Sequence, residues 1–235
     1  MLNLILNNLD KYPLDCVVHY QLEIDWKWTE NVIDYMESKC NQAGIKFIRI
    51  KPRKTWQELY KKYDFPTRRA RWCNSDYKLD AEKQMIKWIE SQNCRPIAYI
   101  GFCADEQRRF KYELGNWKRE AVCYPLAEEG IEENTILEWA RTVPLFQDYY
   151  KYFNRQGCKM CPMLSRKELA YMCKYEHDDF EKYFNYVKAY EKRFNTFFWD
   201  KPYEEIKRTI EVKWCSILTM EEQQVTLFDL LEEEQ

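Results

Sequence analysis

Glycine is scarce in this chain of 235 residues, and no two of its five glycines are adjacent. The sequence therefore lacks a glycine-rich loop of the kind that wraps phosphate groups with backbone N–H groups. Long apolar runs are missing as well. The stretch 1–9 is apolar, but it contains three Asn residues and has neither a basic flank nor a small-residue cleavage site. We therefore expect no signal peptide and no membrane span, and we expect a cytoplasmic protein.

A large charge imbalance is also absent, because 37 basic and 39 acidic residues leave a net charge of -2. Attraction of the whole molecule to a polyanion is not expected, so an anion site must be local. Aromatic residues are plentiful, with 12 Phe, 18 Tyr and 9 Trp. Most of them are expected to pack the core, but aromatic rings also stack on nucleic-acid bases, so nucleic-acid binding stays open.

The hydrophobic pattern predicts one α/β domain with a helical extension, since the chain is long enough for one sizeable core. Short β-rich runs alternate with segments of helical spacing, which indicates parallel strands joined by helices. We expect the α/β domain at residues 1–165, and a helical extension with an acidic tail at 166–235. The expected strands are 16–20, 45–50 and 96–103, the expected helices are 29–40, 79–90, 132–141 and 166–193, and a long loop with a short helix is expected over 51–76.

Ten cysteines in a chain without a secretory signal favour thiols over a disulfide framework. Cys158 and Cys161 form a CxxC pair, whose spacing lets two thiolates reach one metal. Such a pair could be half of a zinc or iron–sulfur site, a redox dithiol, or two buried thiols. Cys73 and Cys123 are candidates for the other two ligands, because both are expected on one side of the sheet, and Cys103 is the reserve.

The remaining cysteines are expected to behave as small buried apolar side chains: Cys16, Cys40, Cys94, Cys173 and Cys215. Neither histidine is expected to bind a metal. His19 belongs to a predicted strand, and His177 is expected on the solvent side of a helix.

Two clusters of charged residues are candidates for ligand binding. Arg68, Arg69 and Arg71 lie on the long loop beside Lys78, and grouped guanidinium groups can hold phosphate or sulfate with paired hydrogen bonds. A solvated loop is the alternative.

The second cluster follows the strand predicted at 96–103. Asp105 and Glu106 could hold Mg²⁺ or a ribose hydroxyl there, and Arg109 could hold phosphate. A structural salt bridge between an Asp and an Arg is the alternative.

Together these segments resemble the phosphoadenosine-phosphosulfate (PAPS) reductase-like family of the adenine nucleotide alpha-hydrolase (PP-loop) superfamily. The matching segments are 17–26, Pro-Thr-Arg-Arg-Ala-Arg-Trp-Cys at 66–73 with Lys78, 101–109, Tyr-Pro-Leu-Ala-Glu at 124–128 with Gly-Ile at 130–131, and Asn-Arg-Gln-Gly-Cys-Lys-Met-Cys-Pro at 154–162. The resemblance implies a parallel sheet with helices on both faces and an adenine nucleotide, ATP or a relative, over the carboxyl ends of the strands. It also implies a [4Fe–4S] cluster, or alternatively zinc, held by Cys73, Cys123, Cys158 and Cys161.

Two departures from the family pattern shape the expected function. The family's phosphate loop, Ser-Gly-Gly-Lys-Asp-Ser, has no counterpart, and residues 1–6 read as the helix that would follow it. We therefore expect an α/β fold that lacks its first strand and PP-loop. True sulfonucleotide reductases carry a catalytic Cys in a Glu-Cys-Gly tail, whereas this chain has Trp-Cys-Ser at 214–216. Reduction of PAPS is not expected.

Two functions are compatible with these expectations, and no catalytic residue is assigned in either. The first is a nucleotide-site enzyme, or its remnant, for ATP-dependent adenylation or sulfur transfer, with the missing loop supplied upstream or by a second chain. The second is a non-catalytic, metal-stabilised binding module that acts through a protein partner or as a homo-oligomer. Residues 224–228, Gln-Val-Thr-Leu-Phe, also resemble peptides that dock on sliding clamps, but a tail helix packed on the body is the favoured interpretation.

Overall fold

The computed structural model describes residues 1–110, 113–114, 117–118, 121–153 and 157–222. The chain divides into two compact units. Unit 1 comprises Met1–Leu59 and Trp72–Tyr150, and unit 2 comprises Tyr60–Arg71 and Lys151–Gln235. The expected boundary lay after residue 165, whereas this division groups 151–165 with the C-terminal helices. The clamp-like peptide at 224–228 lies outside the described residues.

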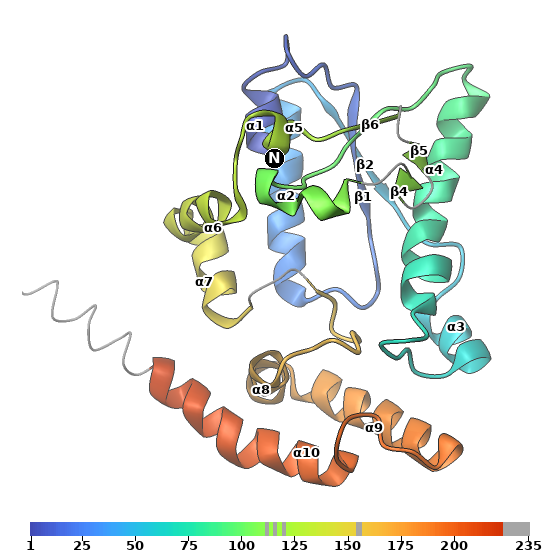
Figure 1. Ribbon diagram of the computed structural model, residues 1–235, viewed down its shortest axis with the longest axis vertical. Coiled ribbons are helices and arrows are strands. Elements are labelled where there is room, and N and C mark those ends of the chain that lie inside the picture. Colours follow the sequence, from blue (N-terminus) through green and yellow to red (C-terminus); the bar gives the residue numbers. More distant parts are fainter. Residues whose placement is uncertain (111–112, 115–116, 119–120, 154–156, 223–235) are drawn as a thin grey trace, which may run out of the picture. The chain divides into compact units, whose positions relative to one another are not determined.

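A parallel strand pair with a helical crossover opens unit 1. Strand β1 (Cys16–Tyr20) pairs with β2 (Lys46–Ile50), and Val18 lies opposite Ile48. Parallel strands need a long connection, and helix α2 (Lys27–Gln42) supplies it (Figure 1). The helix buries Val32, Ile33 and Cys40. The expected strand at 16–20 is confirmed, and the helix expected at 29–40 begins two residues earlier.

The remaining strands of unit 1 are short. Strands β3 (Ala98–Tyr99) and β6 (Val122–Cys123) are parallel, and Ile100 extends their ladder by donating its N–H to the Cys123 carbonyl at 2.9 Å. Strands β4 (Glu113–Leu114) and β5 (Trp117–Lys118) are antiparallel. The strand expected at 96–103 is thus reduced to two residues. The described residues form separate two-stranded sheets within a mixed α/β arrangement.

Helices and tighter turns complete unit 1. The long loop expected over 51–76 contains helix α3 (Trp56–Tyr63), which continues into unit 2. The other elements of this part of the chain are α1 (Leu2–Leu6), the π-helix η1 (Cys73–Lys78), α4 (Leu79–Ser91), the 3₁₀ helix η2 (Ala104–Arg109), α5 (Pro125–Glu128), α6 (Glu133–Thr142) and α7 (Pro144–Tyr152).

Aromatic packing joins α2 to the segment that follows α6. The Trp28 ring stacks on Tyr149 with centroids 4.1 Å apart, and its indole N–H donates to the Leu145 carbonyl at 3.2 Å. Phe146 packs in the same buried cluster as Val32 and Ala140 of unit 1. This use of aromatic side chains as core fits the expectation from composition.

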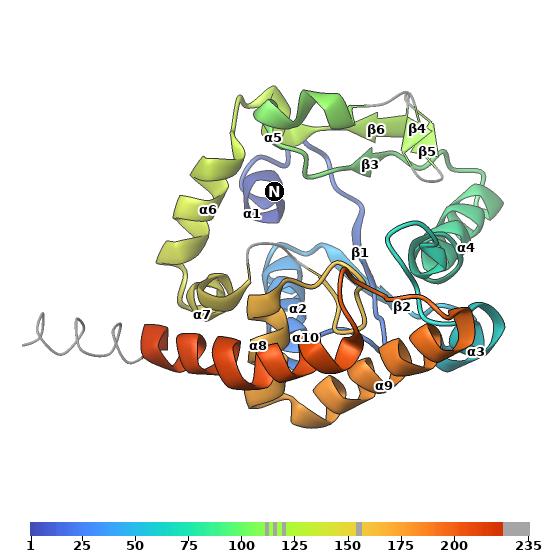
Figure 2. The ribbon, with the colours of Figure 1, turned by 60° about the horizontal axis from the view of Figure 1, so that its bottom comes forward.

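Unit 2 is helical in its C-terminal part. Helices α8 (Arg166–Tyr175), α9 (His177–Phe194) and α10 (Tyr203–Thr209) pack together, and the π-helix η4 (Ile210–Trp214) leads into helical residues 215–222 (Figure 2). Their shared core is apolar and aromatic, and its fully buried members are Leu169, Ala170, Met172, Phe180, Tyr183, Val187 and Ile210.

Helix α8 begins with a capping box that the sequence pattern Ser-x-x-Glu encodes. The Ser165 hydroxyl accepts from the Glu168 N–H at 3.2 Å, and the Glu168 carboxylate accepts from the Ser165 N–H at 2.6 Å. Two backbone donors at the helix start are thereby satisfied. At the end of α9, Asn195 takes the left-handed conformation that terminates a helix.

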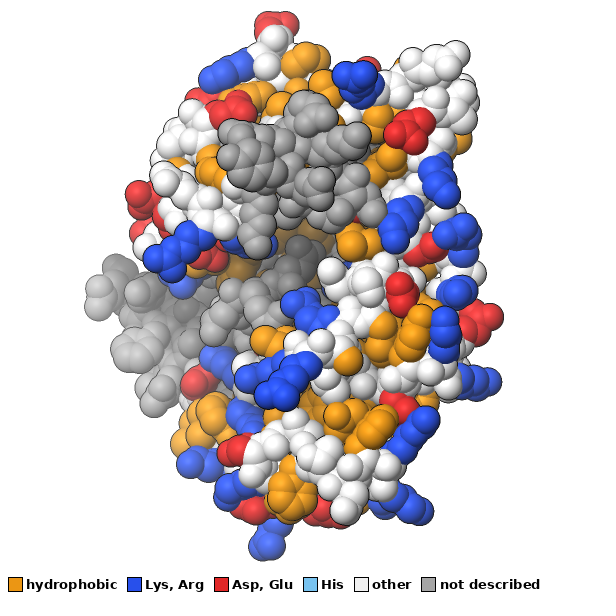
Figure 3. Space-filling view, turned by 45° about the vertical axis from the view of Figure 1, so that its right-hand side comes forward, with side chains coloured by type: hydrophobic (Ala, Val, Ile, Leu, Met, Phe, Trp, Pro, Cys, Tyr) orange, Lys and Arg blue, Asp and Glu red, His pale blue; other side chains and the backbone are white. Residues whose placement is uncertain are grey.

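No helix among the described residues is long and apolar enough to cross a membrane. On the face drawn in Figure 3, Lys and Arg side chains lie among acidic and apolar ones rather than forming one continuous basic field. This pattern agrees with the near-zero net charge.

Replacing a core leucine tests the packing of unit 2. Leu169 on α8 has 0% exposure, so we expect Leu169→Ala to lower the free energy of unfolding by about 2–5 kcal/mol through lost burial and a residual cavity. Urea unfolding followed by circular dichroism measures the change. Val212→Ala, at a position with 65% exposure in the same unit, is the control and should change stability by less than about 0.5 kcal/mol. Equal effects of the two substitutions would contradict the packing.

Candidate functional site

The residues singled out from the sequence are distributed over both units. Unit 1 contains Cys73, Lys78, Asp105, Glu106, Arg109 and Cys123, and unit 2 contains Arg68, Arg69, Arg71, Cys158 and Cys161.

The CxxC pair of unit 2 lies in a hydrogen-bonded turn. The Cys161 N–H donates to the Cys158 carbonyl at 3.1 Å, and the Leu164 N–H donates to the Cys161 carbonyl at 3.3 Å. Cys158 is buried, whereas Cys161 is partly exposed. A turn of this size is the backbone form through which a CxxC pair presents two thiolates to one metal.

Lys159, between the two cysteines, anchors this turn. Its ammonium group donates to the Glu176 carboxylate at 3.0 Å and to the Asp179 carboxylate at 2.7 Å, and the Lys159 side chain is only 14% exposed. Burial alone would lower the pKa of Lys159, but its hydrogen bonds to the carboxylates of Asp179 and Glu176 outweigh burial and raise that pKa. Lys159 is therefore a structural cation, and no local motif in the sequence links it to Glu176 and Asp179.

Tyr183 of α9 provides a second anchor. Its hydroxyl donates to the Cys161 carbonyl at 3.2 Å, and its ring meets the Phe65 ring edge to face at 5.2 Å. Burial raises the pKa of Tyr183 well above its usual value, with a further contribution from Cys161. The phenol therefore stays protonated and acts as a hydrogen-bond donor. Helical spacing predicted a helix at this residue, but no motif indicated a contact with the CxxC turn.

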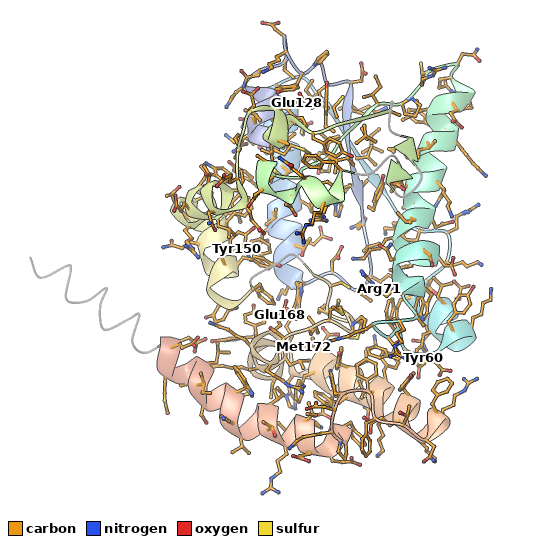
Figure 4. All side chains as sticks on the ribbon, viewed as in Figure 1. Tyr60, Arg71, Glu128, Tyr150, Glu168 and Met172 are labelled. Carbon is orange, nitrogen blue, oxygen red and sulfur yellow. The ribbon has the colours of Figure 1, made fainter. Side chains whose placement is uncertain are left out.

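Glu168 is a buried carboxylate in the same unit. Glu168 and Met172, both labelled in Figure 4, are four residues and so about one turn apart on α8. One oxygen of Glu168 closes the capping box, and the other has no hydrogen-bond partner among the described residues although the side chain is 2% exposed. Its charge also acts on the Tyr183 hydroxyl. The Glu168 carboxyl group and the thiols of Cys158 and Cys161 thus all lie near the Tyr183 hydroxyl.

The arginine loop, residues 67–71, is held in a turn by Thr67. The Thr67 hydroxyl accepts from the N–H groups of Arg69 at 3.3 Å and Ala70 at 3.0 Å, and the Thr67 N–H donates to the Ala70 carbonyl at 3.1 Å. Arg68, Arg69 and Arg71, the last marked in Figure 4, are exposed. Within the part of the chain that the structure describes, no carboxylate pairs with these three guanidinium groups.

Arg166 at the start of α8 adds a further guanidinium to unit 2. Burial lowers the pKa of Arg166, and the nearby positive charge of Arg68 lowers it further, while Asp200 opposes both. The Asp200 carboxylate is 3.8 Å away and its side chain is 78% exposed, so this ion pair is weak. Arg166 also lies 5.2 Å from the centroid of the Trp199 ring. Arg68 and Arg166 therefore concentrate positive charge locally.

In unit 1, the acidic residues after β3 are occupied by local structure. Asp105 accepts from the Glu133 N–H at 3.2 Å at the start of α6, and Glu106 accepts from the Cys103 N–H at 3.0 Å. The hydrogen bond from Cys103, followed by that from Arg109, lowers the pKa of Glu106. The guanidinium of Arg109 forms an ion pair with Glu106 and lies 4.0 Å above the ring of Phe102. A structural salt bridge is thus present, but Glu106 forms it and not Asp105, which accepts a backbone N–H instead.

The cysteines of unit 1 have separate positions. Cys73 opens η1 and is 6% exposed, and Cys123 ends β6. Burial, with help from Glu128, raises the pKa of Cys123. Burial also raises the pKa of the reserve candidate, Cys103. Lys78 ends η1, where it is partly exposed.

Among the described residues, no group of three or more His, Cys, Asp or Glu side chains is arranged to hold a metal ion. The CxxC turn fits half of a four-thiolate site.

Of the other cysteines, Cys40 is buried as expected, whereas Cys94 is exposed beside Asn93, which has a positive φ of 56° after α4. His19 lies in β1 and His177 is exposed, as expected.

Comparisons with known proteins give distant relatives. No family model matches the chain, and no solved structure matches it. Uncharacterized protein MJ0066 of Methanocaldococcus jannaschii is 25% identical over 178 residues, which cover 71% of this chain and 35% of that protein. Uncharacterized protein MJ0973 of the same organism is 25% identical over 176 residues, covering 68% of this chain and 39% of that protein. The chain thus spans well under half the length of these relatives.

Removing the central cation tests the anchoring of the CxxC turn. We expect Lys159→Met to lower the free energy of unfolding by about 1–3 kcal/mol, because two partly buried carboxylates lose their hydrogen-bonded cation. The raised pKa of Lys159 stabilises the fold at pH values below the unfolded pKa near 10.5. The difference between wild type and variant should therefore stay constant up to that pH and shrink above it.

Urea unfolding at a series of pH values measures this difference. Lys182→Met removes an exposed lysine of the same helix bundle and should leave the free energy of unfolding almost unchanged. A Lys159 effect that matches the Lys182 effect, or one that grows above pH 10.5, would show that Lys159 is not an anchor.

Proposed function

We propose that this chain is a PAPS reductase-like protein that binds a phosphorylated or sulfated adenine nucleotide through its arginine loop. The observation that carries the proposal is the exposed positive charge of that loop, which is unpaired within the described chain. Three exposed guanidinium groups extend from a turn held by Thr67, and none has a carboxylate partner among the described residues. Guanidinium groups bind phosphate and sulfate oxygens with paired, charge-assisted hydrogen bonds. Arg166, close enough to feel the charge of Arg68, adds to this positive region.

The proposal includes a metal centre held by cysteine. Cys158 and Cys161 would supply two thiolates, and Cys73 and Cys123 would supply the other two. Four thiolates suit a [4Fe–4S] cluster or a tetrahedral zinc ion. The anchoring of the CxxC turn by Lys159 and Tyr183 supports the first half of this set, because contacts that orient metal ligands increase the affinity for the metal. Such a centre would stabilise the fold.

The reaction class follows from the family resemblance. We propose ATP-dependent adenylation or sulfur transfer in the cytoplasm, on the parallel-sheet fold of the PP-loop superfamily. The parallel pairs β1–β2 and β3–β6 support that fold. The second candidate is a non-catalytic, metal-stabilised binding module that acts through a protein partner or as a homo-oligomer. One observation favours it: Asp105, Glu106 and Arg109 are already engaged in helix capping and in an ion pair.

Metal analysis tests the proposed centre. Protein purified without oxygen should contain iron with sulfide, or zinc, and Cys158→Ser or Cys161→Ser should lose most of it because each removes a thiolate ligand. Elemental analysis and visible absorption measure the content. Cys94→Ser removes an exposed thiol outside the proposed set and should retain the metal. Wild-type protein without any metal, or equal loss in Cys94→Ser, would refute the centre.

Nucleotide binding tests the arginine loop. We expect adenosine 3′,5′-bisphosphate to bind, and Arg68→Ala, Arg69→Ala or Arg71→Ala each to raise its Kd by about 10- to 100-fold, the value of one hydrogen bond between charged groups. Isothermal titration calorimetry at fixed ionic strength measures the Kd. Arg208→Ala, which removes an exposed arginine of the same unit, should leave it unchanged. Unchanged affinity in all three loop variants would exclude this loop. Turnover of ATP by the same preparation separates an enzyme from a binding module.

A further inference from the structure

Two cysteines that sequence reasoning assigned to plain burial share one contact in unit 2. Cys173 lies in α8, and Cys215 directly follows η4. The Cys215 sulfur lies 3.9 Å from the Ala170 carbonyl, less than one turn before Cys173 on α8. The two thiol side chains also interact directly with each other. Both thiols are therefore at the same contact between α8 and the C-terminal helical segment.

The π-helix η4 sets the direction of Cys215. Its wider turn is closed by the Cys215 N–H, which donates to the Ile210 carbonyl five residues earlier. A regular helix advances about 100° per residue, so one extra residue in a turn rotates everything after it by about that angle. A regular α-helix from Ile210 onward would turn Cys215 away from its present direction.

Polar contacts hold the two helical segments in register around these thiols. Lys167, near the start of α8, forms an ion pair with Glu221 at 2.7 Å. Lys174, next to Cys173, donates to the Thr219 hydroxyl at 3.2 Å and forms an ion pair with Glu222. These contacts come from both ends of α8 and limit how far the helices can separate.

Both thiols are accessible to small reagents. Cys173 and Cys215 are partly exposed, so a small reagent can reach them. Burial, followed by Cys215, Glu211 and Glu181, raises the pKa of Cys173 to about 12. Cys173 is therefore protonated near neutral pH and is a poor first nucleophile.

We propose that Cys173 and Cys215 are a redox-active dithiol, which low-molecular-weight disulfides convert into an intramolecular disulfide joining α8 to residues 215–222. The Cys215 thiolate attacks one sulfur of oxidised glutathione, forms a mixed disulfide and releases one glutathione thiolate. Cys173 then loses its proton to water and attacks the Cys215 sulfur, which releases the second glutathione. The protein thiols give up two electrons in total, and one glutathione disulfide becomes two glutathione thiols.

This bond would act on the helix that supports the CxxC turn. Helix α8 begins shortly after Cys161, and Glu176 at its other end pairs with Lys159. Oxidation therefore fixes α8 to a second helical segment, while the reduced protein holds them by non-covalent contacts alone. The inference does not depend on the proposed nucleotide site.

Oxidation of the full chain with glutathione disulfide, followed by digestion without reductant and mass spectrometry, tests the proposal. We expect a peptide linking Cys173 to Cys215 in wild type and in Cys94→Ser. Closing a loop of roughly forty residues should raise Tm by roughly 5–15 °C, and dithiothreitol should reverse the rise. The cross-link and the rise should be absent in Cys173→Ser and Cys215→Ser.

The matched control is internal to the chain. Cys94 is the exposed cysteine and should take up glutathione without forming this bond. Glutathione on Cys94 with Cys173 and Cys215 both still open to alkylation would overturn the proposal, as would a cross-link from either residue to Cys158 or Cys161. Mass-spectrometric mapping of the disulfide-linked peptides in wild-type protein tests the proposed bond even if a serine variant fails to fold.

Discussion

The hydrogen bond from the Tyr183 hydroxyl to the Cys161 carbonyl is the contact on which the arrangement of unit 2 depends. A fully buried phenol must have a hydrogen-bond partner, because burying an unpaired hydroxyl costs about 1–3 kcal/mol. Within the described part of the chain, the Cys161 carbonyl of the CxxC turn accepts this hydrogen bond, so the burial of α9 and the placement of the turn are linked. The rings of Phe65 and Trp199 fill the space around the phenol.

The partly buried charges beside the CxxC turn are tolerated because nearly all of them are paired. Lys159 lies between Glu176 and Asp179, and each of the three groups would be costly in a half-buried position alone. Glu168 is the exception, since one of its oxygens has no partner among the described residues. Its other oxygen is fixed by the capping box, so the carboxylate is held there by helix geometry and not by an opposite charge.

Local periodicity was enough to predict the elements that depend on neighbouring residues. The β-rich run at 16–20 corresponds to β1, and the helical spacing at 29–40 corresponds to α2. The helix expected from residue 166 begins there as α8. The apolar run at 96–103 forms only a two-residue strand, because its length in a sheet depends on a partner strand elsewhere in the chain. Pairing lengths of this kind cannot be inferred from the run itself.

The types of residue in the candidate site could be predicted from the sequence. Which of their side chains already form ion pairs or hydrogen bonds could not. The same sequence reasoning proposed Arg109 and Arg68 as anion ligands, yet Arg109 is paired with Glu106, and Arg68 has no acidic partner among the described residues. The roles of Lys159 and Tyr183 were missed for a related reason. Each depends on a contact between residues 158–161 and α9, about twenty positions along the chain, which no local motif encodes.

A carboxylate that caps a helix or fixes a turn has little capacity left for a ligand. Asp105 closes the start of α6, and Glu106 holds both the Cys103 N–H and the Arg109 guanidinium. Binding a nucleotide through these groups would first require breaking contacts worth about 1 kcal/mol or more each. The exposed guanidinium groups of the arginine loop face no such competition. An anionic ligand would therefore gain most where the described chain leaves positive charge unpaired, and this is the physical reason why we propose the arginine loop, and not the exit of β3, as the anion site.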